Sequence, residues 1–294
     1  MDMHIEFLQR LVDKGGPDTE DFYDLDAWLA EIAEHARKGN MKPSDLSRLR
    51  DVLGDAISVD TMQGICFLKP HGYAGDYEII DRMYTRRISG KAHLSKWDVY
   101  AQNHAAAHAV RNRMQYLSQL LEKNIRSSGH AGMVLNLASG PGRDMLHFFE
   151  NNPDTQVHFD CVEQDQNAVN HAKALCKDFL HKTTFHVRNA LRFQSKKKYD
   201  LIWSAGLFDY FEDEVFVFML NRLRTMVAES GEIVIGNFST MNPSRSYIEL
   251  FEWYLHHRSP NTLKGFALAA GFTPDQISIE REPTGVNLFL HLRP

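Results

Sequence analysis

Short apolar runs alternate with helical segments from residue 132 onward, and this rhythm constrains the fold more than any other feature of the sequence. Such alternation is typical of a mainly parallel sheet that helices cover on both faces. The last two runs are joined by a stretch typical of a hairpin turn, residues 281–285, so the final strand is expected to be antiparallel to its neighbour. The predicted strands are Met133–Leu137, Val157–Val162, Thr184–Arg188, Tyr199–Ser204, Glu232–Asn237, Gln276–Glu280 and Val286–Leu292.

These runs predict an α/β fold with a Rossmann-like, seven-stranded, mostly parallel sheet, an antiparallel last strand and an N-terminal helical region. Residues 1–129 are assigned to the helical region with a lid loop, and residues 130–294 to the domain that holds the sheet. The 294 residues are enough for one such domain plus a helical extension.

The N-terminal part carries helical patterns interrupted by one turn-rich stretch. Residues 20–38 and the segment after Pro43 place apolar residues three and four apart, which predicts two helices with one buried face each. Residues 60–95 are rich in turn formers and aromatics, so an ordered loop is expected there. One long helix is expected over 97–125, ending near residues 127–129, and another at about 261–270.

Composition excludes several classes of protein. Apolar residues make up 43% of the chain and charged residues 24%, as in ordinary globular proteins. The formal net charge of −5 provides no field for a polyanion, so no nucleic-acid partner is expected. The beginning of the chain lacks a signal-peptide pattern and no run approaches 18 apolar residues, which predicts no membrane insertion and a cytoplasmic location. The oligomeric state stays open.

The three cysteines suggest neither a disulfide framework nor a zinc site. Cys66, Cys161 and Cys176 are far apart in the sequence and form no closely spaced pair. A reducing compartment fits this usage.

The strongest local pattern is an apolar strand, a turn of small residues and a helix, over Val134–Asp144. Small residues let the backbone approach a ligand at the carboxyl end of a strand, where open α/β sheets bind cofactors. The stretch resembles motif I of S-adenosyl-L-methionine (SAM) methyltransferases, with Asn136 in place of the acidic residue and Ala138 in place of the first glycine. A strand, turn and helix without a ligand is the alternative. The residues of this stretch predicted to bind cofactor are Asn136, Ala138, Ser139, Gly140 and Gly142.

A carboxylate at the end of the next predicted strand supports a nucleoside cofactor. Glu163 follows Gly142 by 21 positions and can accept hydrogen bonds from ribose hydroxyls, and Gln164 comes next. A dinucleotide fingerprint would need a small residue where Met145 stands, so SAM is favoured over NAD.

Two further strand ends complete the predicted cofactor site. Asn189 and Ala190 follow the third strand, where methyltransferases commonly place an Asp or Asn beside the adenine, although Asn189 fits a loop cap as well. The small residues after the fourth strand are expected to border the methionine part of SAM, and Tyr210 to face the acceptor as a catalytic candidate. The absence of an Asn/Asp-Pro-Pro-aromatic motif argues against DNA as acceptor. The small residues are Ser204, Ala205 and Gly206.

Several segments together resemble one narrower family, the methyltransferases of bacterial extracellular-factor biosynthesis. The resemblance covers the chain from about residue 64 to the end. It implies a SAM-dependent enzyme that methylates a 3-hydroxy fatty acid, a small-molecule acceptor. The segments are Gly72–Tyr77, Ser204–Tyr210, Gly236–Phe238, Phe251–Arg258 and Pro283–Leu288.

Candidate acceptor residues lie in the turn-rich stretch and after the fifth strand. Tyr73, Asp76 and Tyr77 are either a lid or part of a structural loop. Arg245, Tyr247 and Trp253 stand where methyltransferases of this class often insert acceptor-binding elements.

Two histidines of the long predicted helix are the other candidates. His104 and His108 are four apart and would share a helix face, but no third ligand is evident, so no metal is predicted. His104 is a candidate base or hydrogen-bond donor, with a packing role as the alternative.

The function expected from these residues is O-methylation of a small-molecule carboxylate, such as that of a 3-hydroxy fatty acid, by SAM. A carboxylate is already ionised at neutral pH and needs no base, whereas a hydroxyl acceptor does. The alternatives are a non-catalytic SAM- or S-adenosylhomocysteine-binding regulatory module and a methyltransferase for another small molecule. A nucleoside-cofactor oxidoreductase and a methyltransferase for protein or RNA are further rivals.

Overall fold

The computed structural model describes residues 1–128 and 132–294, which form two compact units. Unit 1 comprises Met1–His108 and Pro243–Tyr254, and unit 2 comprises Ala109–Asn242 and Leu255–Pro294. The domain boundary predicted between residues 129 and 130 lies outside the described residues. Among the described residues, no helix is both long and apolar enough to span a membrane.

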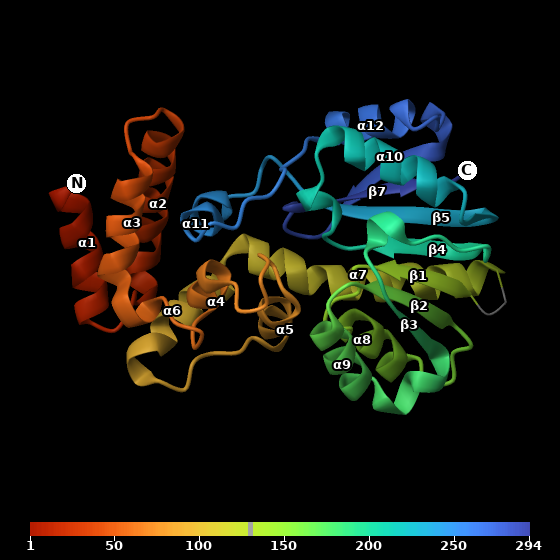
Figure 1. The fold of residues 1–294 in the computed structure, drawn as a ribbon, viewed down its shortest axis with the longest axis horizontal. Coiled ribbons are helices and arrows are strands. Elements are labelled where there is room, and N and C mark those ends of the chain that lie inside the picture. The colour runs from red at the N-terminus through yellow and green to blue at the C-terminus, as the bar shows by residue number, and fades with distance from the viewer. Residues whose placement is uncertain (129–131) are drawn as a thin grey trace. The chain divides into compact units, whose positions relative to one another are not determined.

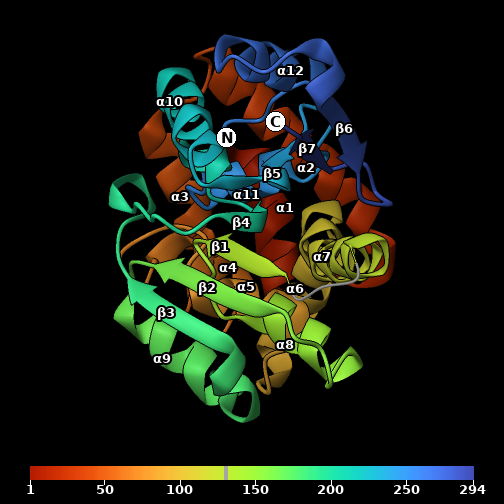
Figure 2. The same cartoon turned by 90° about the vertical axis from the view of Figure 1, so that its right-hand side faces the viewer.

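Unit 2 is built on one seven-stranded sheet with the order β3-β2-β1-β4-β5-β7-β6, and Figure 2 shows the strands in this order from lower left to upper right. β1 to β5 pair in parallel, and β7 runs antiparallel to both β5 and β6. The predicted sheet with one reversed last strand is therefore confirmed. The strands are β1 Met133–Leu137, β2 His158–Glu163, β3 Thr183–Val187, β4 Tyr199–Ser204, β5 Val227–Phe238, β6 Ile277–Arg281 and β7 Asn287–Leu292.

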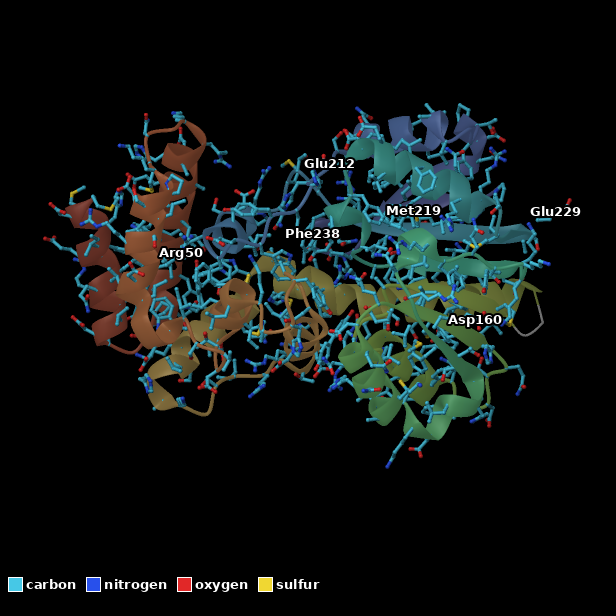
Figure 3. All side chains as sticks on the ribbon, viewed as in Figure 1. Arg50, Asp160, Glu212, Met219, Glu229 and Phe238 are labelled. Carbon is cyan, nitrogen blue, oxygen red and sulfur yellow. The ribbon has the colours of Figure 1, made fainter. Side chains whose placement is uncertain are left out.

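Helices cover both faces of this sheet, as Figure 1 shows. Side chains from α7 and α8 pack with Phe159 and Trp203 on one face, where α9 also contacts β2 and β3. Side chains from α10 and α12 pack with Leu135 and Ile202 on the other face. Met219 in Figure 3 is one of the buried residues of α10. The helices are α7 Ala105–Ser128, α8 Arg143–Asn151, α9 Gln166–Leu175, α10 Asp213–Arg224 and α12 Pro260–Ala269, with short 3-10 turns η3 Lys177–Lys182, η4 Ala190–Arg192, η5 Phe208–Tyr210 and η6 Pro274–Gln276.

Burial on both faces explains why the inner strands read as continuous apolar runs rather than as an alternating pattern. One exception is Asp160 in β2, labelled in Figure 3, whose side chain is 1% exposed. Its Oδ2 accepts hydrogen bonds from Lys197 Nζ and from the Tyr199 hydroxyl, both at 2.8 Å. Oδ2 is thus paired with a lysine and hydrogen-bonded, which offsets part of the cost of burying the carboxylate, whereas Oδ1 has no hydrogen-bond partner among the described residues.

Unit 1 is helical, and its helices pack against one another in pairs. α1 contacts α3, α11 contacts α2, and α4 contacts both α5 and α6. The two helices predicted over 20–38 and after Pro43 are confirmed as α2 and α3. The elements are α1 Asp2–Asp13, η1 Thr19–Asp21, α2 Phe22–Arg37, α3 Pro43–Leu53, η2 Gly54–Ala56, α4 Met62–Leu68, α5 Tyr77–Thr85, α6 Ala92–Asn103 and α11 Arg245–Leu250.

The prediction of a loop over 60–95 is wrong, because this stretch contains α4, α5 and the start of α6. Polar side chains begin two of these helices. The Thr61 side chain accepts a hydrogen bond from Gly64 N, and the Asp76 side chain accepts two, from Glu78 N and Ile79 N. The turn-forming residues occupy only the short links between the helices, which hid the helical spacing on either side of them.

The single helix predicted over 97–125 is also wrong, because it breaks into α6 and α7 at His104. His104 is extended, with ψ at 143°. Neither Pro nor Gly marks this break in the sequence. The His104 ring stacks on Tyr247 and meets the edge of Tyr100, so packing within unit 1 overrides local helix propensity here.

The core of unit 2 gives a direct test of this packing. Phe148 in α8 is fully buried among Phe149 and Phe159, and Phe148→Ala should lower the free energy of unfolding by about 3–5 kcal/mol. Phe218→Ala is the matched control, because Phe218 in α10 is 54% exposed and its loss should cost about 0.5 kcal/mol or less. Urea unfolding followed by circular dichroism measures both. Equal losses in the two variants would contradict the described core.

Candidate functional site

In the turn between β1 and α8, three alternate positions have left-handed backbone conformations: Ala138 (φ 53°), Gly140 (φ 52°) and Gly142 (φ 75°). Gly142 is confined as well, because a Cβ there would lie 3.0 Å from Ala172 Cβ and 3.1 Å from Met145 Cε. At Gly140 the position of a Cβ has no atom of the described residues within 4 Å. The backbone at Gly140 therefore borders open space, which leaves room for a ligand.

The Glu163 carboxylate ties this turn to the end of the neighbouring strand. Its Oε2 accepts a hydrogen bond from Gly140 N at 3.0 Å, and its Oε1 accepts from Gln164 N at 2.8 Å and Asp165 N at 3.0 Å. Burial raises the pKa of Glu163, whereas these three backbone donors act in the opposite direction. A carboxylate offers about four acceptor positions, so about one remains for a ligand hydroxyl.

Hydrogen bonds connect the other predicted cofactor residues at the carboxyl ends of the strands. Asn189 caps η4 through Leu191 N and also donates to Gln164 Oε1 at 3.0 Å. At the end of β4, the Ser204 hydroxyl donates to Leu137 O at 3.2 Å. All of the predicted cofactor residues belong to unit 2, and they lie in or directly after β1, β2, β3 and β4.

The side chain of Asn136 contacts a second buried polar side chain, that of Asp144. Its Nδ2 donates to Asp144 Oδ2 at 3.3 Å, and Asp144 Oδ1 accepts from Met145 N at 2.9 Å. Burial raises the pKa of Asp144. The two departures from motif I thus differ in kind: Asn136 is held by a partner, whereas Ala138 occupies a backbone conformation in which glycine is relaxed.

These residues fit a nucleoside cofactor on two observations, the remaining acceptor position of Glu163 and the open space at Gly140. Comparison of the sequence with protein families agrees with a cofactor of this kind. Residues 134–231 match the family model described as "Methyltransferase domain". This segment is a methyltransferase domain. Unit 2 contains this segment and extends it to a seven-stranded sheet with a reversed β7, the sheet of class I methyltransferases, whose methyl donor is SAM.

Solved structures share the fold at low sequence identity, and no curated protein matches the chain. A possible exported protein from Bordetella parapertussis is 17% identical with a TM-score of 0.67, over 90% of this chain and 95% of that one. A Nostoc punctiforme protein with the provisional name O-methyltransferase is 15% identical with a TM-score of 0.55, over 79% and 72%. Magnesium protoporphyrin IX methyltransferase from Synechocystis, with bound S-adenosylhomocysteine, is 10% identical with a TM-score of 0.50, over 66% and 89%. At these identities the likeness shows the fold alone, and the cytoplasmic location stays a prediction.

The residues predicted for catalysis and for the acceptor are divided between the units. Tyr210 lies in η5 of unit 2 and is 40% exposed. His104 belongs to unit 1, where its ring stacks on Tyr247 with centroids 4.2 Å apart. His104 Nε2 is buried without a hydrogen-bond partner among the described residues, and burial lowers the pKa of His104 to about 3.

Unit 1 also holds the six residues predicted to bind the acceptor. Tyr247 and Trp253 are buried, and the Tyr247 hydroxyl donates to Gln63 Oε1 at 3.3 Å. Arg245 instead pairs with Glu249 on α11 at 2.6 Å. Asp76 caps α5, and Tyr77 begins that helix 4.6 Å from the His71 ring. Tyr73 lies in the link before α5.

Sequence reasoning missed two buried residues beside the predicted site. Asp209 is 2% exposed, and its Oδ1 accepts a hydrogen bond from Phe238 N at 2.7 Å. Arg113 of α7 is 6% exposed and donates to Ala205 O at 3.0 Å. Asp209 lay within a segment that carried the family resemblance, but Arg113 is one of several charged residues on a long helix, and nothing in the sequence distinguishes it.

The described residues contain no group of three or more His, Cys, Asp or Glu side chains placed to hold a metal ion. Cys66, Cys161 and Cys176 are free thiols in the buried interior.

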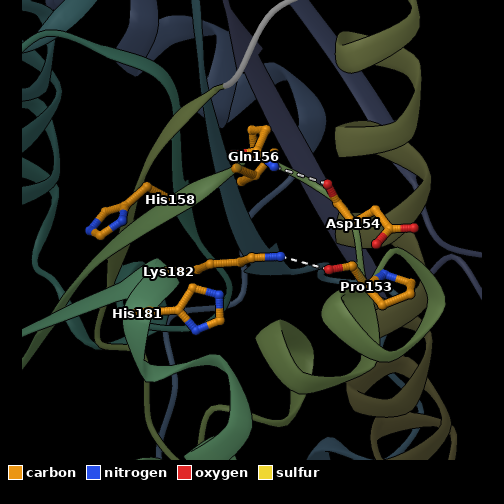
Figure 4. Close-up of a pocket in the computed structure, with 7 residues that line it drawn as sticks. Pro153, Asp154, Gln156, His158, His181 and Lys182 are labelled. Atoms are coloured by element: carbon orange, nitrogen blue, oxygen red, sulfur yellow. Dashed lines mark hydrogen bonds between the residues drawn. The ribbon is translucent and has the colours of Figure 1, made fainter.

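A surface hollow lies at the opposite end of the strands. It is lined by polar residues that include His158 at the start of β2 and Lys182 before β3, and Lys182 Nζ donates to Pro153 O at 2.6 Å (Figure 4). No predicted site residue lines this hollow.

The buried carboxyl of Asp209 predicts a pH dependence of stability. Burial raises its pKa from 3.8 to about 7, so between these values the unfolded chain loses a proton that the folded chain keeps. Rising pH over this window therefore favours unfolding. Asp209→Asn should remove this dependence. The free energy of unfolding of the variant, relative to that of the wild type, should therefore rise by at most about 4 kcal/mol from pH 4 to pH 8. Urea unfolding across this range measures the difference, and a constant difference would contradict the prediction.

Proposed function

We propose that this chain methylates an oxygen of a small-molecule carboxylate, such as that of a 3-hydroxy fatty acid, with SAM as donor. The observation that carries the cofactor part is the hydrogen bond between Gly140 N and the Glu163 carboxylate, which fixes the glycine turn beside the end of β2. The acceptor part rests on the family resemblance of the sequence and on the chemistry of the candidate bases.

Each group of cofactor residues has a role that follows from its position. Glu163 would accept from a ribose hydroxyl, and Gln164, Asn189 and Ala190 would border the adenine. The turn from Ala138 to Gly142, together with Asn136, would lie against the rest of the nucleoside and the amino acid. Ser204, Ala205 and Gly206 would border the methionine part. SAM supplies a methyl group bonded to a positively charged sulfur, and the protein's task is to align the acceptor with that bond and to exclude water.

The titration of the candidate base favours a carboxylate acceptor. A hydroxyl acceptor must lose a proton to a base of suitable pKa, whereas a carboxylate is already ionised at neutral pH. With a pKa of about 3, His104 is neutral at pH 7 but a weak base. An acceptor that needs no base therefore suits these residues better. The proposal includes two assignments made from the sequence. Tyr210 would take part in catalysis, and the acceptor would be bound by Tyr73, Asp76, Tyr77, Arg245, Tyr247 and Trp253.

Cofactor binding is tested with S-adenosylhomocysteine, the demethylated form of SAM. At 100 times its dissociation constant it should stabilise the folded protein by about 2.7 kcal/mol, measured by thermal unfolding. Glu163→Gln should weaken binding about tenfold or more. The amide NH₂ of the glutamine would face one of the backbone N–H groups from which the carboxylate accepts hydrogen bonds, and two donors cannot bond to each other. The control Glu229→Gln, at an exposed position of β5 (Figure 3), should bind as the wild type does.

The reaction itself is tested by incubating the protein with methyl-labelled SAM and a series of 3-hydroxy fatty acids. Mass spectrometry should find the label in methyl esters of these acids, and alkaline hydrolysis of the esters should release it as labelled methanol. Label in another small molecule would support the assignment as a methyltransferase and replace the proposed acceptor. Binding of S-adenosylhomocysteine without any labelled product would favour a regulatory module, and failure to bind it would remove the proposal.

A further inference from the structure

Arg113 is a buried cation whose hydrogen bonds are incomplete. Its side chain is 6% exposed, and Nη1 donates to Ala205 O at 3.0 Å. The Nε atom is buried and has no hydrogen-bond partner among the described residues. Burial of a charged group is costly unless the charge is paired and its donors are satisfied. Among the described residues, the guanidinium therefore has a carbonyl partner but no ion-pair partner, and its Nε–H is unsatisfied.

The position of the guanidinium places it beside the predicted cofactor residues. A Cβ built on Gly206 would lie 2.8 Å from Arg113 Nη1, so a residue with a side chain at 206 would displace the guanidinium. Ala205 and Gly206 follow β4 directly, at the carboxyl end of the parallel strands. Arg113, Ala205 and Gly206 all belong to unit 2, which also contains the glycine turn and Glu163.

The nearby carboxyl groups do not neutralise this cation. Asp144 and Asp209 both interact electrostatically with Arg113, but within the described part of the chain neither forms an ion pair with it within 4.0 Å. Both oxygens of Asp144 accept from other donors, Met145 N and Asn136 Nδ2, and Oδ1 of Asp209 accepts from Phe238 N. Burial raises the pKa of both groups, and the value of about 7 for Asp209 means that this carboxyl carries only part of a negative charge at neutral pH.

We propose that Arg113 binds a carboxylate of a ligand at the end of β4, next to Ala205 and Gly206. This inference rests on the proposed function, which supplies two carboxylates, that of the methionine part of SAM and that of the acceptor. A guanidinium suits either one, because its planar array of N–H donors matches the geometry of a carboxylate and keeps its charge at any physiological pH. Arg113 is thus an anion-binding residue that holds one end of a ligand in line for the reaction.

The experiment compares three probes by isothermal titration calorimetry on the full chain. S-Adenosylhomocysteine carries the methionine carboxylate, 5′-methylthioadenosine has the same nucleoside thioether without the amino acid, and 3-hydroxydecanoate carries the acceptor carboxylate. Arg113→Met removes the charge but keeps an extended side chain. Arg113→Lys keeps the charge without the planar array.

Arg224→Met is the matched control. Arg224 Nη1 donates to Gly271 O at 2.9 Å, and a Cβ built on Gly271 would lie 2.9 Å from the same atom. Arg113 Nη1 makes the corresponding contacts with Ala205 O and with a Cβ built on Gly206. Arg224 is exposed and lies at the end of α10, away from the predicted cofactor residues in sequence. Melting temperatures of both Met variants without ligand show whether each is folded. The control should bind all three probes as the wild type does.

Two results support the proposal and distinguish the sources of the carboxylate. If the methionine carboxylate is the ligand, Arg113→Met weakens S-adenosylhomocysteine about tenfold or more and leaves 5′-methylthioadenosine unchanged. If the acceptor carboxylate is the ligand, S-adenosylhomocysteine is unchanged and 3-hydroxydecanoate binding to the S-adenosylhomocysteine complex weakens by a similar factor. In both cases Arg113→Lys should recover part of the loss.

Other results overturn it. Equal weakening of S-adenosylhomocysteine and 5′-methylthioadenosine would mean that Arg113 only holds the loop after β4. No change with any probe would mean that it binds no carboxylate. If the wild type itself binds no S-adenosylhomocysteine, the proposed function fails first, which separates that failure from a failure at Arg113.

Discussion

The carboxylate of Glu163 is the contact on which the arrangement of the methyltransferase domain depends. It is the last residue of β2, and it accepts backbone hydrogen bonds both from its own strand end and from Gly140 in the turn after β1. Because the two strands are parallel neighbours, one side chain fixes the distance between their ends. A turn with three left-handed positions would otherwise be free to collapse into the space that the ligand needs.

The sheet was predictable because its signals are local. Each parallel strand is a short apolar run, and the turn before β7 has hairpin residues, so both the number of strands and the reversal of the last one follow from the sequence. The cofactor residues were predictable for a related reason. In a parallel sheet, the residues that follow or end the strands lie at the same end of the sheet. Gly140, Glu163 and Ser204 could therefore be placed together without knowledge of tertiary contacts.

The parts that sequence reasoning missed depend on contacts between distant residues. His104 ends a helix because its ring packs with Tyr247, which lies more than a hundred positions away in the chain. Arg113 looks like any charged residue of a long helix until Ala205 O and the bare backbone of Gly206 are seen beside it. The helices α4 and α5 were hidden differently, since glycines in the links on either side outweighed the capping signals of Thr61 and Asp76.

The place of β7 between β5 and β6 has a consequence for how the protein is made. The ribosome produces β5 and β6 before the strand that joins them, so both emerge with unpaired backbone groups along the edges that later face β7. Every side chain of β7 is buried, and its insertion therefore completes the sheet and the cores on both faces in one late step. Until that step a nascent chain carries two open strand edges, a state in which pairing with another chain competes with correct folding.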